Sequence, residues 1–133
     1  MKTAVVVVSH SKALAEGVQE LAHQMARADD LVWAVGGTED GRIGTSALAI
    51  RDVLDRALAV ADAAVVIMDL GSAHLNTVMA IEMLDAPLQE RVIMADAPLV
   101  EGAVLAVVAA SSGDDAQTVR DRAEEARDMR KFM

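Results

Sequence analysis

The stretch TAVVVVSHS, residues 3–11, decides how this chain folds. Its four consecutive valines, residues 5–8, are typical of a strand that is buried on both faces of a parallel sheet. The strand ends in Ser9, His10 and Ser11, and a helical pattern begins directly after them. In open parallel α/β sheets, ligands and chemistry gather just beyond the carboxyl ends of the strands. The sequence therefore places an imidazole where it can act as a nucleophile, a general base or a metal ligand.

Length and composition limit the class of protein. The chain has 133 residues, of which 53% are hydrophobic but only 2% aromatic, so we expect one domain over residues 1–133 with a single core. Few aromatic side chains disfavour a surface that stacks bases or sugars, and a net charge of −9 disfavours nucleic acid or an anionic membrane as partner. The chain has no cysteine, which excludes thiol chemistry. It shows neither an apolar run long enough to cross a membrane nor a signal peptide, so we expect a cytoplasmic protein.

Strand-like apolar runs alternate with amphipathic stretches along the chain. The apolar runs begin near residues 4, 31, 63 and 91. After the first run, Leu14, Val18, Leu21 and Met25 fall on one helical face. This alternation predicts right-handed βαβ units in an α/β fold: a three-layer open sheet, mainly parallel, with strand order 2-1-3-4 and helices on both faces. The last helical stretch, after residue 114, has little apolar material, so we expect it at the periphery.

Two polar residues, His10 and Asp69, end the first and third predicted strands. In the 2-1-3-4 order these strands are neighbours, and the switch point of the sheet lies between them. A carboxylate there can accept a hydrogen bond from the imidazole, which fixes the tautomer and leaves the other ring nitrogen free to attack. The alternatives are a polar loop histidine and an aspartate that only caps a helix. The joint placement at the switch point favours a functional pair.

Two loops are suited to bind phosphate. Gly71 and Ser72 open one predicted helix, and Thr45 lies where another begins, which places backbone N–H groups and hydroxyls at helix N-termini. Ser9 and Ser11 flank the histidine and complete the candidate phosphate ligands. The alternative is that these hydroxyls only cap helices. Neither GxxxxGK[ST] nor GxGxxG is present, so direct binding of ATP or a dinucleotide has no support and we expect no cofactor.

The other two histidines are weaker candidates. His23 falls on the polar side of the first predicted helix, and His74 falls in the first turn of the third. His74 is close enough to contribute to the site. A metal site can be drawn from His10, Asp69 and His74, but no paired-ligand motif supports it, so we predict no metal.

Three motifs together resemble those of a known family. They are SHS at the end of the first strand, DLGSA at the end of the third and APLVEGA after the fourth. Over residues 3–112 the sequence resembles, in collinear order, the mannose-type enzyme IIA domain of the phosphoenolpyruvate-dependent phosphotransferase system. APLVEGA, residues 97–103, points to the branch of the phosphotransferase subunit of bacterial dihydroxyacetone kinase rather than to sugar import.

The resemblance implies that His10 is the phosphorylated residue and takes phosphate from the histidine phosphocarrier protein. It implies that phosphate then passes to ADP on the nucleotide-binding subunit of the kinase, which acts beside a dihydroxyacetone-binding subunit. Asp69 matches the carboxylate that pairs with the active histidine, and Gly71 and Ser72 match its phosphate-side loop. Mannose-type domains dimerise, so a homodimer is implied as well. Asn76 falls at a position that we take as variable, and we assign it no role.

The docking of partner proteins would need apolar residues around His10. Four leucines are candidates for this surface, and each has the alternative of being an ordinary core residue: Leu14, Leu70, Leu75 and Leu99. For Leu14 the core is the favoured interpretation.

Other functions remain open. Mannose-type sugar import is the alternative within the family. A receiver-like regulator would carry phosphate on Asp69, but it needs an acidic pair after the first strand, where this chain has residues 9–11, Ser-His-Ser. A non-catalytic α/β interaction module with an incidental histidine is the third alternative.

Overall fold

The structure is a computed structural model that describes residues 1–26 and 30–132. Four parallel strands form one sheet in the order β2-β1-β3-β4. These strands are β1 (Thr3–Ser9), β2 (Val32–Gly36), β3 (Ala63–Met68) and β4 (Val92–Met94). The predicted α/β class, the strand order and the central place of the valine strand are confirmed.

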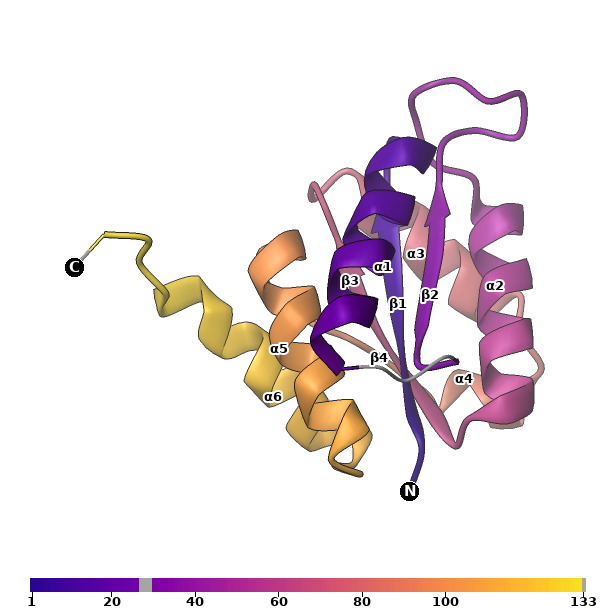
Figure 1. The fold of residues 1–133 in the computed structure, drawn as a ribbon. Helices are drawn as coiled ribbons and strands as arrows, with labels where there is room; N and C mark the ends of the chain where they lie inside the picture. The colour runs from indigo at the N-terminus through magenta and orange to yellow at the C-terminus, as the bar shows by residue number, and fades with distance from the viewer. Residues whose placement is uncertain (27–29, 133) are drawn as a thin grey trace.

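Helices cover both faces of the sheet, which gives the three expected layers (Figure 1). One face is covered by α1 (Lys12–Ala26), α5 (Leu99–Ser111) and α6 (Ala116–Glu124), and the 3-10 helix η1 (Glu125–Asp128) follows α6. The other face is covered by α2 (Ala47–Val60), α3 (Ala73–Glu82) and the short α4 (Ala86–Gln89). No helix in the described residues is long and apolar enough to cross a membrane.

The valines of β1 explain the two core layers. Successive side chains of a strand point to opposite faces, so Val5 and Val7 pack with α1, α5 and α6, while Val6 and Val8 pack with α2 and α3. All four are completely buried, which is worth roughly 1.5–3 kcal/mol for each side chain. This firmly packed strand fixes the residue that follows it, His10, at the carboxyl edge of the sheet.

Two details differ from the sequence-based prediction. Helix α6 is not peripheral, because Val119 and Ala123 are completely buried in the core beside α5. Its small side chains let the helix lie close to its neighbours, so little apolar volume suffices. The short α4 is a helix that the sequence pattern did not predict. Proline is tolerated in the first turn of α4 because the N–H that it lacks has no partner there.

Candidate active site

His10 lies directly after β1, and Asp69 lies directly after β3. The two strands pair up to Val8 and Met68, and the Asp69 N–H extends the pairing by donating to the Val8 carbonyl at 3.0 Å. The imidazole Nδ1 of His10 consequently lies 2.9 Å from Oδ1 of Asp69. The structure thus brings together the two residues that the strand order placed at the switch point.

The Asp69 carboxylate accepts four hydrogen bonds. Oδ2 accepts from the Ser9 hydroxyl and from the His10 backbone N–H, both at 2.9 Å. Oδ1 accepts from the Leu70 N–H at 2.7 Å and faces the His10 ring. Burial alone would raise the pKa of this carboxyl, but the hydrogen bonds from His10, Ser9 and Leu70 outweigh it and hold the pKa of Asp69 below its ordinary value. Asp69 is therefore ionised at neutral pH.

The ionised carboxylate fixes the tautomer of His10. A carboxylate only accepts hydrogen bonds, so Nδ1 carries the ring proton and Nε2 of the neutral ring keeps its lone pair. The Ser72 hydroxyl lies 2.8 Å from Nε2 and donates to that lone pair. The His10 side chain remains 20% exposed, so Nε2 is an oriented nucleophile within reach of a docked partner.

The N-terminus of α3 lies beside Nε2. Ser72 precedes the helix and brings its hydroxyl to His10, as described above. Within residues 1–26 and 30–132, the backbone N–H groups of Gly71 and Ser72 donate no hydrogen bond to the chain. Helix N-termini with free N–H groups favour anions. The arrangement can therefore hold phosphoryl oxygens next to the nucleophilic nitrogen.

The prediction that Ser9 binds phosphate is wrong, because its side chain points into the protein. The residue is completely buried, and its hydroxyl donates to Asp69 while accepting from the Ser11 N–H at 3.0 Å. Ser9 therefore supports the carboxylate instead of binding phosphate. The Ser11 hydroxyl oxygen accepts from the Leu14 N–H at 3.2 Å at the start of α1, and a phosphate contact of Ser11 stays a prediction.

Thr45 belongs to the loop of residues 37–46, which joins β2 to α2 and extends beyond the carboxyl edge of the sheet (Figure 1). In this loop the Gly44 N–H donates to the His10 carbonyl at 2.8 Å. The Thr45 Oγ1 accepts from the Asn76 amide at 2.7 Å. A phosphate contact of Thr45 stays a prediction. Asn76, to which the sequence assigned no role, is part of the surroundings of the site.

Gly36 allows β2 to end close to the site. A Cβ at this position would lie 2.5 Å from the Ser11 carbonyl oxygen and 2.8 Å from the carbonyl carbon. Any other residue would push the backbone of Ser11 away, and with it the start of α1. The glycine therefore allows the end of β2 to pack closely against the backbone of Ser11.

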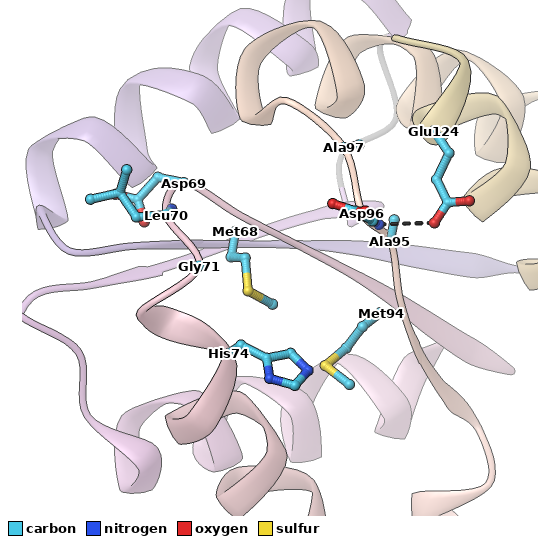
Figure 2. A pocket seen from close by; sticks show the side chains of 10 residues that line it. All are labelled: Met68, Asp69, Leu70, Gly71, His74, Met94, Ala95, Asp96, Ala97 and Glu124. Atoms are coloured by element: carbon cyan, nitrogen blue, oxygen red, sulfur yellow. Dashed lines mark hydrogen bonds between the residues drawn. The ribbon is translucent and has the colours of Figure 1, made fainter. Parts of the chain in front are cut away.

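His74 lines a cavity of about 620 Å³ that opens beside Asp69 at the same edge. Its ring points into the cavity together with the side chains of Met68 and Met94 (Figure 2). In the described part of the chain, no group of three or more His, Cys, Asp or Glu side chains is arranged to hold a metal. His10, Asp69 and His74 are not arranged as such a group, and the absence of a metal stays a prediction.

The remaining candidates divide between surface and core. Leu14, Leu70 and Leu75 are 44%, 60% and 68% exposed, whereas Leu99 is only 8% exposed. Leu99 is a core residue that does not contribute to a docking surface, and Leu14 lies at the surface, contrary to the favoured interpretation. His23 is half-buried on α1, toward its C-terminal end.

Comparison with known proteins identifies the family. Residues 4–120 match the EIIA-man family, described as the PTS system fructose IIA component. The chain is 42% identical over 117 residues to the PEP-dependent dihydroxyacetone kinase, phosphoryl donor subunit DhaM, of Escherichia coli (strain K12), which is 86% of this chain and 25% of that protein. It is 41% identical over 104 residues to subunit DhaM of PEP-dependent dihydroxyacetone kinase 2 of Listeria innocua, which is 78% of this chain and 82% of that protein.

A solved structure has the same fold. The crystal structure of a protein of unknown function is 32% identical, superposes with a TM-score of 0.84, and is matched over 100% of this chain and 99% of that chain. The chain spans about a quarter of the length of the first curated relatives that it matches. It belongs to the EIIA-man family, in the branch of the DhaM phosphotransferase subunits.

Proposed function

We propose that this chain is a phosphoryl carrier. His10 takes phosphate from the histidine phosphocarrier protein and passes it to ADP bound on the nucleotide subunit of dihydroxyacetone kinase. The observation that carries the proposal is the His10 ring held between Asp69, at Nδ1, and Ser72, at Nε2. The relatives in Escherichia coli and Listeria innocua, phosphoryl donor subunits of PEP-dependent dihydroxyacetone kinases, support the choice of pathway.

In the first transfer, the Nε2 lone pair of His10 attacks the phosphorus of the donor's phosphohistidine in line. The P–N bond to the donor ring breaks, and its electron pair stays on that ring. The Ser72 hydroxyl leaves Nε2 and is then free to donate to a phosphoryl oxygen. The phosphorylated ring keeps the proton on Nδ1 and is cationic, so the negative charge of Asp69 stabilises it.

In the second transfer, a β-phosphate oxygen of ADP attacks the phosphorus, and the P–Nε2 bond breaks. The electron pair returns to Nε2, where the Ser72 hydroxyl can bind again. This chain has no nucleotide-binding motif, so another subunit must present the ADP. Exposed Leu14, Leu70 and Leu75 supply apolar surface on the elements that flank His10, which suits two docking proteins in turn.

The assembly is part of the proposal. We propose one mannose-type enzyme IIA domain over residues 1–133 that works as a homodimer in the cytoplasm, with the nucleotide-binding and dihydroxyacetone-binding subunits as partners. The molecular mass in solution, measured by analytical ultracentrifugation, tests the dimer. A monomer at micromolar concentration would contradict it.

The function is tested by following radiolabelled phosphate. The chain is incubated with labelled phosphoenolpyruvate, enzyme I and phosphocarrier, and the acceptors are then added one at a time. We expect uptake of label and its discharge only when the ADP-loaded nucleotide subunit is present, without need for the dihydroxyacetone-binding subunit. The isolated chain should neither bind ATP measurably nor phosphorylate dihydroxyacetone.

Other outcomes decide between the alternatives. Discharge to a mannose-type permease component, with none to the ADP-loaded subunit, would assign the chain to sugar import. Discharge to neither acceptor would favour a regulatory module. Alkali-labile label would identify an acyl phosphate and hence a receiver-like protein.

A further inference from the structure

We propose that Asn76 is a positioning residue for His10. It acts through a closed path in which three hydrogen bonds are joined by short segments of the chain. The path runs from the His10 carbonyl to the Gly44 N–H at 2.8 Å, and from Thr45 Oγ1 to the Asn76 amide at 2.7 Å. It continues along α3 to Ser72, whose hydroxyl returns to His10 Nε2 at 2.8 Å. We call this path the Asn76 ring. The kinetic part of the inference rests on the proposed function.

Asn76 lies in the first turn of α3, on the same side as Ser72, the N-cap residue of that helix. They are four residues apart, which is about one helical turn. The turn between them is held by Ala73 and Thr77, both completely buried, and the Thr77 hydroxyl donates to the Ala73 carbonyl at 2.9 Å. A shift or rotation of this turn that moves Asn76 therefore also moves Ser72. The position of Asn76 determines where the Ser72 hydroxyl meets Nε2.

The link between Asn76 and Thr45 is directional. The Asn76 amide donates to Thr45 Oγ1 at 2.7 Å and also approaches the Thr45 carbonyl oxygen at 3.3 Å. Of the two polar groups of the Asn76 side chain, only the NH₂ group can donate to two oxygens. Asn76 and Thr45 are both half-buried. The Thr45 carbonyl oxygen can only accept, so a donor is needed at residue 76, and Thr45 is needed for its hydroxyl oxygen. This requirement separates the proposal from a purely steric role.

The loop of residues 37–46 connects Asn76 to the backbone of His10. Its first part is bound where the Gly37 N–H donates to the Ser9 carbonyl at 3.3 Å, and its last part where Ser46 caps α2. Between them, Gly44 binds the His10 carbonyl and the next residue binds α3. Loss of the Asn76 amide leaves residues 44–45 bound to His10 but not to α3, the helix that Ser72 precedes.

The proposal predicts how Asn76 variants behave. In Asn76→Ala and Asn76→Asp, we expect phosphate transfer from the phosphocarrier to slow about five- to tenfold with little change in KM. The tautomer of His10 should stay the same, because Asp69 is untouched. The ¹⁵N signal of His10 Nε2 should move toward that of a nitrogen without a hydrogen bond. Thr45→Val should behave like Asn76→Ala, whereas Thr45→Ser, which keeps the hydroxyl, should recover most of the rate and of the Nε2 signal.

A double-mutant cycle tests whether Asn76 acts through Ser72. In the Ser72→Ala background, Asn76→Ala should cause almost no further loss, because the hydroxyl that it positions is already absent. The matched control is Gln89→Ala. The Gln89 amide also donates to two oxygens, the carbonyls of Leu84 at 2.8 Å and Glu82 at 3.2 Å, but it lies in α4, before β4, at the amino edge of the sheet. Gln89→Ala should change neither the rate nor the Nε2 signal.

Two results would overturn the inference: an unchanged Nε2 signal in Asn76→Ala, or an equal loss of rate from Asn76→Ala in both backgrounds. The failure of the proposed function looks different. If the wild-type chain took no phosphate at all, the carrier function would be wrong, and the Nε2 signals of the unphosphorylated variants would still decide the role of Asn76.

Discussion

His10 and His74 lie at the same edge of the sheet, but their surroundings differ. His10 is bound at both ring nitrogens, by Asp69 on one side and Ser72 on the other. His74 is exposed and points into a cavity beside the thioethers of Met68 and Met94 (Figure 2). A position at the carboxyl edge of the sheet alone therefore does not make a histidine a nucleophile. The tautomer must be fixed, and the free lone pair must be oriented.

Carboxylates near a histidine do not suffice either. The cavity that His74 lines also contains Asp96 and Glu124. Glu124 accepts from the Asp96 N–H at 2.9 Å, and the Asp96 carboxylate pairs with Arg127 at 3.4 Å. These acids are engaged with their own neighbours, whereas Asp69 directs one oxygen at the His10 ring. The contrast between the two histidines is open to direct tests.

Removal of His10 gives the largest expected effect. His10→Ala and His10→Gln should abolish phosphate uptake, because no other oriented lone pair replaces Nε2, while the fold stays intact by circular dichroism. His74→Ala and His23→Ala should retain uptake. Intact-mass spectrometry after incubation with the phosphorylated phosphocarrier measures the result. Full phosphorylation of the His10→Ala variant would show that another residue accepts the phosphate.

Neutralising the carboxylate should give the next largest effect. Asp69→Asn keeps the shape but loses the charge that favours the Nδ1-protonated ring and its cationic phosphorylated form. We expect transfer to slow about a hundredfold, roughly 2.7 kcal/mol of barrier. Rapid-quench kinetics check this value, with Asp96→Asn as the matched control at the cavity. Equal losses of rate from Asp69→Asn and Asp96→Asn would show that the carboxylate beside His10 has no special part in transfer.

Removing the Ser72 hydroxyl should have a smaller effect. Ser72→Ala takes away the donor to Nε2 and to the phosphoryl group, but it leaves the tautomer fixed. We expect a loss of about tenfold, or roughly 1.4 kcal/mol. Ser72→Thr keeps a hydroxyl and should recover most of the rate in the same assay. A rate for Ser72→Ala equal to that of the wild type would mean that the hydroxyl has no part in transfer.

The smallest effect concerns stability and pH. Because the folded protein holds the pKa of Asp69 below its ordinary value of 3.8, ionised Asp69 stabilises the fold above that pH. This stabilisation is lost as the pH falls through the lower pKa of the folded state. Urea unfolding of the wild type and Asp69→Asn should therefore show a difference at pH 7 that shrinks toward pH 3. A difference that stays constant with pH would contradict the hydrogen-bonded carboxylate.

Much of the framework could be predicted from the sequence because its signals are local. Residues 5–8 are typical of a strand buried on both faces, and the alternation with helices predicts a parallel sheet. Once the strand order is given, His10 and Asp69 occupy equivalent positions on neighbouring strands. Ser72 follows from the same reasoning, since it opens the helix after β3.

The rest depends on contacts that no local pattern contains. Thr45 and Asn76 are 31 residues apart, and their hydrogen bond exists only because the loop after β2 meets the first turn of α3 at the edge of the sheet. Ser9 is a strand residue that turns inward, so its hydroxyl serves Asp69 although its neighbour His10 is accessible. The exposure of Leu14 and the burial of Leu99 likewise follow from how α1 and α5 lie against the sheet.

The central claim is that Nε2 of His10 carries the phosphate. Its most direct test is the NMR spectrum of the ¹⁵N-labelled wild-type chain after phosphorylation by phosphoenolpyruvate, enzyme I and phosphocarrier, with the lability of the adduct measured alongside. The account predicts a single adduct, acid-labile and alkali-stable, in which phosphorus couples to Nε2 of His10 while Nδ1 keeps its proton. Phosphate on Nδ1 of His10, on His74, or on Asp69 as an alkali-labile acyl phosphate would contradict it.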